Sequence, residues 1–177
     1  MTARIELLQG DITEQSIDAI VNAANTALLP GGGVDGAITD AAGPDAFADR
    51  ERVIRERGRT PLPTGEAVAT IAGDLDARWI IHAAGPIYSG SARDPELLAS
   101  CHRAALSVAD ELGARTVAFP AISTGIYGYP VDLAAPVAIA AVTDAETAVE
   151  LVRFVLFSRR DLEVFRGALD TARRRSG

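Results

Sequence analysis

The sequence contains no lysine, a single cysteine and few aromatic residues. Without lysine it can form neither a catalytic Schiff base nor a P-loop that grips phosphate through a lysine. Cys101 alone can form no internal disulfide and no cysteine-rich zinc site. No run of about 18 apolar residues is present, and the N-terminus enters a strand pattern without a leader-like segment. We therefore expect a cytoplasmic enzyme or binding module with no membrane association.

Charge and composition narrow the range of partners. The formal net charge of −7 repels phosphate backbones, so broad binding to nucleic acid is not expected. A small anionic ligand would have to be held by local donors such as backbone N–H groups. Apolar residues make up 48% of the chain and aromatics 5%, which favours α/β layers. The length predicts one domain over residues 1–177.

Strand and helix patterns alternate along the chain. Strands are expected at residues 4–9 (at a sheet edge), 18–22, 66–71, 78–83, 115–120 and 151–157. Helices are expected from the glycine run to Gly43 and at residues 44–57, 94–113, 132–142 and 158–172. Pro136 should mark the start of the regular part of its helix, and the arginine-rich end should fray. The alternation predicts a sheet covered on both faces, with ligands bound beyond the carboxyl ends of its strands.

The stretch from Gly10 to Gly43 carries the densest motifs. A buried strand is followed by Asn22 and Asn25 and then by Gly31-Gly32-Gly33-Val34-Asp35-Gly36. Glycines let the backbone approach a ligand closely, and a helix start behind them is a ready anion site. The pattern also matches G-x-G-x-x-G, but the intervening loop and the lack of an acid-ended second strand argue against a dinucleotide site.

These motifs carry a family resemblance. G-D-I-T, V-N-A-A-N and G-G-G-V-D-G, followed by Pro120 to Pro130 as P-A-I-S-T-G-I-Y-G-Y-P, resemble a macrodomain of the MacroD type over essentially the whole chain. The resemblance implies a three-layer α/β/α fold around a mixed sheet of about six strands. It implies a hydrolase that binds ADP-ribose and removes mono-ADP-ribose from acidic side chains. O-acetyl-ADP-ribose deacetylation and a non-catalytic ADP-ribose reader stay open as alternatives.

The resemblance also implies a set of site residues, with ADP-ribosylated proteins or metabolites as substrates and no cofactor or metal. It assigns catalysis to Asp35 and Asn25, with a water held between Asp35 and a substrate phosphate and attacking the distal ribose. The implied ADP-ribose contacts are Asp11, Ile12, Asn25, Gly32, Gly33, Val34, Asp35, Ser123, Thr124, Gly125, Ile126, Tyr127 and Phe157. Among these, Asn25 and Tyr127 would meet the distal ribose.

Several of these residues have a purely structural alternative. Asp11 is spaced to cap a helical turn, whereas the resemblance implies that it accepts a hydrogen bond from the adenine 6-amino group. Phe157 either packs on adenine or belongs to the core. Asn22 is expected to hold loop backbone.

The two histidines and Cys101 are expected to serve structure. His82 closes a strand, and His102 should point about 100° away from its neighbour Cys101 on a helix, which excludes a catalytic dyad. No spacing of His, Asp and Cys predicts a metal site.

Asp35 near a helix start should stay ionised, because the helix dipole stabilises its charge. An ionised carboxylate is a weak general base at neutral pH, which favours orienting a water over abstracting its proton. Where the family commonly carries histidine, this chain has Thr39. The substitution removes a group that could carry a proton or hydrogen-bond near the site.

Overall fold

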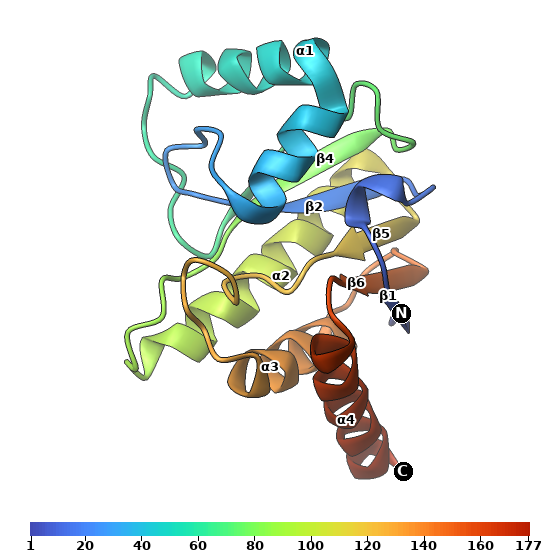
Figure 1. Ribbon diagram of the computed structural model, residues 1–177. Helices are drawn as coiled ribbons and strands as arrows, with labels where there is room; N and C mark the ends of the chain where they lie inside the picture. The colour runs from blue at the N-terminus through green and yellow to red at the C-terminus, as the bar shows by residue number, and fades with distance from the viewer.

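The computed structural model describes residues 1–177 and shows a six-stranded mixed sheet between two helical layers (Figure 1). The strands are β1 (Arg4–Gln9), β2 (Ala19–Ala24), β3 (Ala67–Ile71), β4 (Trp79–Ala84), β5 (Thr116–Phe119) and β6 (Leu151–Leu156). The helices are η1 (Ile12–Glu14), α1 (Gly33–Glu56), α2 (Arg93–Leu112), α3 (Val131–Asp144) and α4 (Arg159–Ser176). The predicted α/β/α fold is confirmed.

The sheet order is β1-β6-β5-β2-β4-β3, with every pairing parallel except that of β3 with β4. β1 lies at an edge, as its sequence predicts. α1 covers one face of the sheet, and α2, α3 and α4 cover the other (Figure 1). None of these helices combines the length and the apolar character needed to cross a bilayer.

β2 shows how the sequence builds this core. Ala19 and Val21 belong to the apolar cluster under α2, α3 and α4, whereas Ile20 belongs to the cluster under α1. All three are fully buried, because alternate side chains of a strand point to opposite faces and both faces are covered. Asn22 was predicted to follow this strand. Asn22 instead lies inside β2, because the pairing of β2 with β4 continues to Ala24.

α1 bends at the predicted Gly43-Pro44 break. Gly43 has φ 81° and ψ −173°, which interrupts the helix and turns its second half. The Ala42 carbonyl at the break accepts a hydrogen bond from the Asp74 N–H at 2.8 Å. A Cβ on Gly43 would come within 2.5 Å of the Asp74 carboxylate, so both backbone conformation and space require glycine.

Two predicted helix details are wrong. α3 begins at Val131, and Pro136 lies inside it. Pro136 and Asp132, whose carbonyl would pair with the missing N–H, are both exposed, so water can replace that bond. The arginine-rich end does not fray, since α4 continues to Ser176. Ser158 caps α4 as predicted, by accepting a hydrogen bond from the Asp161 N–H at 3.1 Å.

Both histidines are buried in the sheet and helix core. His82 Nδ1 lies 3.1 Å from Asn22 Nδ2, and its Nε2 lies 2.9 Å from Thr70 Oγ1. His102 donates from Nδ1 to the Leu98 carbonyl at 2.7 Å, which fixes its tautomer, and stacks on Phe119. Burial lowers the pKa of His82 to about 3 and that of His102 to about 4. Both rings are therefore neutral at physiological pH.

The free energy of unfolding should fall as the pH drops below 6.5. Both folded-state pKa values lie below the unfolded value of about 6.5. The unfolded chain therefore binds more protons, and the stability is fully present above pH 6.5 and lost below it. At pH 5 each histidine should lower the free energy of unfolding by roughly 2 kcal/mol. Urea unfolding at pH 7 and pH 5 measures this loss.

His102→Leu is the matched variant for this measurement, because Nε2 of His102 has no hydrogen-bond partner. It should remove about half of the loss between pH 7 and pH 5. An unchanged pH dependence in this variant would show that His102 does not titrate as its burial requires.

Candidate functional site

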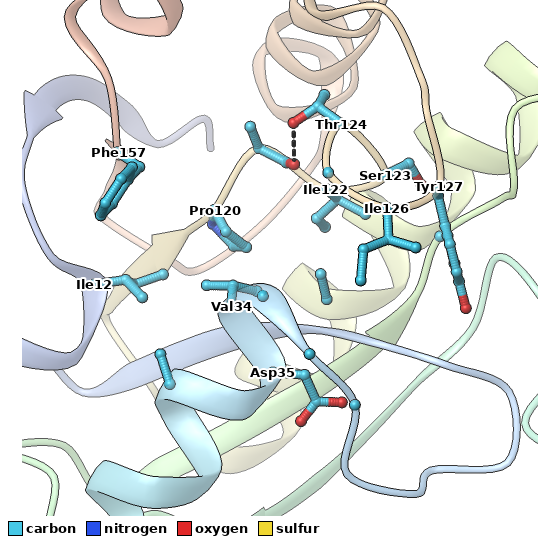
Figure 2. A pocket seen from close by; sticks show the side chains of 18 of the residues that line it. Ile12, Val34, Asp35, Pro120, Ile122, Ser123, Thr124, Ile126, Tyr127 and Phe157 are labelled. Atoms are coloured by element: carbon cyan, nitrogen blue, oxygen red, sulfur yellow. Dashed lines mark hydrogen bonds between the residues drawn. The ribbon is translucent and has the colours of Figure 1, made fainter.

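A cavity of about 680 Å³ opens at the carboxyl ends of the parallel strands. Segments after β1, β2, β4, β5 and β6 and the start of α1 line it, as expected for a doubly covered α/β sheet. All thirteen residues predicted to contact a ligand lie on its wall. Figure 2 shows Ile12 and Phe157 at one end of the cavity and Ile126 and Tyr127 at the other.

The glycine run forms one wall. α1 begins at Gly33, whose φ of 59° suits glycine. The N–H groups of Gly33, Val34 and Asp35 have no backbone acceptor, as at any helix start. A Cβ on Gly32 would lie 3.5 Å from Ile126 Cδ1, so the two loops approach each other across the cavity here. The predicted helix start behind the glycines, with its free N–H groups, is therefore present at this wall.

The loop after β5 forms the opposite wall. Its turn is closed by Tyr129 N–H donating to the Ser123 carbonyl at 2.9 Å and by Gly128 N–H donating to the Gly125 carbonyl at 3.0 Å. Thr124 donates from Oγ1 to the Ala121 carbonyl at 2.8 Å (Figure 2). The backbone N–H groups of Gly125, Ile126 and Tyr127 remain without acceptors. They make the second wall another row of free donors.

Ser123 is held in an unusual conformation within this loop. Its φ is 68°, in the left-handed region that non-glycine residues rarely adopt. Its Oγ is buried and has no hydrogen-bond partner. The side chain packs against Gly85, where an added Cβ would overlap Ser123 Oγ and lie 2.5 Å from Ile122 Cγ2. Gly85 therefore fixes where this loop lies, and the sequence interpretation missed it.

Asp35 lies beneath the glycine wall and forms a buried ion pair with Arg50. Arg50 Nη1 lies 2.7 Å from Oδ1, and Nη2 lies 2.9 Å from Oδ2. Thr39 donates from Oγ1 to Oδ1 at 3.1 Å. Asp35 is only 3% exposed.

The ion pair sets the charge of Asp35. Burial alone would raise the pKa of this carboxyl, but the hydrogen bonds and charge of Arg50 outweigh it and lower the pKa below the usual range. Asp35 is therefore ionised as predicted, and the interaction with Arg50 is the main cause. Position 39 still supplies a hydrogen-bonding group without the histidine, because Thr39 donates a hydrogen bond to Asp35.

Asn25 uses its amide to shape the loop after β2. Its Oδ1 accepts from the Leu29 N–H at 3.1 Å, and its Nδ2 donates to the Leu29 carbonyl at 2.6 Å. The backbone-holding role expected of Asn22 therefore falls to Asn25. Asn22 instead contacts His82 and is fully buried. Asn25 still lines the cavity, and its contact with a ribose stays a prediction.

Asp11 and Phe157 lie at the end opposite Tyr127. Asp11 Oδ1 accepts from the Thr13 N–H at 2.9 Å and from Thr13 Oγ1 at 2.7 Å, so the capping alternative is confirmed. These hydrogen bonds lower the pKa of Asp11. Its adenine contact remains a prediction. The core alternative for Phe157 is wrong, because this ring is 90% exposed at the cavity wall.

Cys101 and His102 take no part in the cavity. Cys101 Sγ lies 3.8 Å from His102 Nδ1, closer than their helical spacing predicts. That nitrogen already donates to Leu98, and burial raises the pKa of Cys101 to about 12. No reactive thiolate pair results. No group of three or more His, Cys, Asp or Glu side chains is placed to hold a metal ion.

The comparisons with known proteins agree with this architecture. The Macro domain family model matches residues 21–138. A macro domain-containing protein of Streptomyces coelicolor is 57% identical over 165 residues, which cover 93% of this chain and 98% of that protein. A Salmonella gallinarum protein named O-acetyl-ADP-ribose deacetylase is 48% identical over 167 residues, covering 94% of this chain and 92% of the relative.

Among solved structures, a variant of the Oceanobacillus iheyensis macrodomain with ADP-ribose superposes with a TM-score of 0.90 at 42% identity. The match covers 96% of this chain and 94% of that one. The chain belongs to the macrodomain family, and the predicted membership is confirmed.

Proposed function

We propose that this macrodomain binds ADP-ribose in the cavity and hydrolyses the ester that joins mono-ADP-ribose to an acidic side chain. The supporting observation is that two segments whose backbone N–H groups have no acceptor line one cavity, together with the ionised Asp35. The two segments suit the two phosphates of a diphosphate. The adenine end would lie at Asp11 and Phe157, and the distal ribose at Asn25 and Tyr127.

In the proposed reaction a water attacks the anomeric carbon of the distal ribose. The bond from that carbon to the ester oxygen breaks, and the target leaves as a carboxylate. Asp35 orients the water by accepting one of its hydrogen bonds. Because Asp35 is paired with Arg50, it is a poor proton acceptor. The substrate phosphate accepts the other hydrogen bond of the water, and the proton that the water loses passes to solvent as the carboxylate leaves.

A second candidate activity is deacetylation of O-acetyl-ADP-ribose in the same cavity. The deacetylase name of the Salmonella gallinarum relative favours it. In this reaction water attacks the acetyl carbon, and the ribose hydroxyl is the leaving group. The nucleotide contacts are the same in both reactions, so only product analysis with each substrate separates them.

The deciding experiment incubates the protein with a mono-ADP-ribosylated glutamate peptide or with O-acetyl-ADP-ribose. Free ADP-ribose and acetate are followed by chromatography and mass spectrometry. A calorimetric titration with ADP-ribose in chelator should show micromolar binding. Binding without turnover of either substrate would identify a reader. Heat seen only after a divalent ion is added would contradict the proposal of a site made from backbone donors.

Asp11→Ser should weaken ADP-ribose binding by roughly 1–3 kcal/mol, the usual loss for a hydrogen bond to a charged group. Serine still caps η1 but is too short to reach adenine. Thr13→Val is the matched control, because it removes the side-chain hydrogen bond to Asp11 Oδ1 and keeps the carboxylate. If affinity and melting temperature are both unchanged in Asp11→Ser, Asp11 serves only as the cap, which serine still provides.

A further inference from the structure

Arg50 is a buried cation that joins three parts of the candidate site. It lies in the second half of α1, beyond the bend at Gly43, and its side chain is 5% exposed. Besides holding Asp35, it donates from Nε to the Leu28 carbonyl at 2.5 Å and from Nη2 to the Leu29 carbonyl at 3.2 Å. An arginine is rarely buried unless its hydrogen-bond donors are satisfied. Here the donors of Arg50 bond to Asp35 and to the carbonyls of Leu28 and Leu29.

These bonds limit what Asp35 can do. A carboxylate has about four acceptor positions. Oδ1 accepts from Arg50 and Thr39, and Oδ2 accepts from Arg50 alone. The free position is therefore on Oδ2. This is also the oxygen that a Cβ on Gly31 would meet, at 3.8 Å. One oxygen of Asp35 thus remains able to accept a hydrogen bond next to the glycine wall.

Arg50 is also coupled to Asn25 through a shared acceptor. The Leu29 carbonyl accepts from Asn25 Nδ2 and from Arg50 Nη2. Leu29 N–H in turn donates to Asn25 Oδ1. The guanidinium therefore fixes both the Asp35 rotamer and the loop that carries Asn25.

We propose that Arg50 is a positioning residue for the hydrolysis: it orients Asp35 so that Oδ2 faces Gly31 and holds the 25–29 loop in register with it. The inference rests on the proposed function. Arg50 acts only through these two groups, since it does not line the main cavity. A planar fork is needed, because lysine offers the charge but not two parallel donors.

Other groups near Asp35 cannot replace this pairing. Thr39 on α1 and Asn22 on β2 are neutral polar neighbours of Asp35, and of the two Thr39 donates a hydrogen bond to it. His82 on β4 is buried and neutral, and Asp49 on α1 is a further carboxylate near that ring. Arg50 is the only cation that hydrogen-bonds to Asp35. Without it the carboxylate stays buried with no positive partner, and its pKa should rise.

The test compares Arg50→Gln and Arg50→Lys with Arg52→Gln. Arg52 is a matched control on the same helix, because its side chain is exposed and neither it nor its ion-pair partners Asp49 and Glu56 line the cavity. We expect kcat to fall about 10²-fold in both Arg50 variants, the scale of a misplaced catalytic group, with KM changed less than about tenfold. The acid limb of the pH–kcat profile should move upward only in Arg50→Gln. Arg52→Gln should leave kcat, KM and the pH–kcat profile unchanged.

A readout without turnover separates this inference from the proposed function. The ¹³C shift of the Asp35 carboxyl carbon, assigned with Asp35→Asn, is titrated in wild type and in Arg50→Lys and Arg50→Gln. An upward shift of the Asp35 titration in Arg50→Gln supports the pairing even if no substrate is hydrolysed. Identical Asp35 titrations and a normal kcat, with only a lower melting temperature, would overturn the proposal. If Arg50→Gln does not fold, a normal kcat in Arg50→Lys would overturn it equally.

Discussion

Asp35→Ala should lower turnover about 10²–10⁴-fold, or roughly 3–5 kcal/mol in the barrier. ADP-ribose affinity should change by less than about tenfold, or roughly 1.4 kcal/mol. The reason is that the free acceptor position on Oδ2 can orient a water that is present only in the reaction. Single-turnover hydrolysis and calorimetry with ADP-ribose measure the two quantities separately. Asn25→Ala, by contrast, should lower both, since it would act on the distal ribose throughout the reaction.

The buried ion pair demands a stability control for this prediction. Asp35→Ala leaves Arg50 buried without its counter-charge, which should cost about 3–5 kcal/mol of unfolding free energy. The double variant Asp35→Ala/Arg50→Met removes both charges and should recover part of that stability. Turnover should stay low in both. Near-normal hydrolysis by folded Asp35→Ala would contradict the proposed role of Asp35. Catalysis would then depend on the substrate phosphate and the glycine backbone.

The features predicted best from the sequence depend on neighbouring residues. The apolar run at Ile20 and Val21, the glycines before α1 and the Gly43-Pro44 break each carry their signal within a few positions. Such patterns predict a buried strand, a helix start with free N–H groups and a bend. Since parallel strands place their carboxyl ends on one edge, the two glycine loops could also be predicted to meet.

The features that were missed depend on contacts between distant residues. Arg50 lies 15 positions after Asp35, and only the bend at Gly43 returns its guanidinium to that carboxylate. As one of many arginines in the segment, it carried no local signal of burial. The backbone-holding role predicted for Asn22 belongs to Asn25, because β2 pairs with β4 as far as Ala24 and so includes Asn22. Propensity alone does not determine where such a strand ends.

Gly85 illustrates the same point, since its role comes from a loop almost 40 residues later in the chain. The local sequence at Gly85 indicates only an ordinary turn before Pro86. In the structure it leaves the space that Ser123 and Ile122 occupy at the base of the second wall. A side chain there must displace the buried side chains of Ser123 and Ile122, and with them the loop.

Gly85→Ala should therefore weaken ADP-ribose binding about 10–100-fold, corresponding to an overpacking cost of roughly 1–3 kcal/mol. Gly167→Ala is the matched control, because Gly167 lies within α4 and an added Cβ there meets no atom within 4 Å. It should leave affinity unchanged and slightly raise the melting temperature. Combining Gly85→Ala with Ser123→Gly should recover part of the affinity, since it removes the overlapping hydroxyl and relaxes the positive φ. If calorimetry finds wild-type affinity in Gly85→Ala alone, the second wall does not depend on Gly85 for its position.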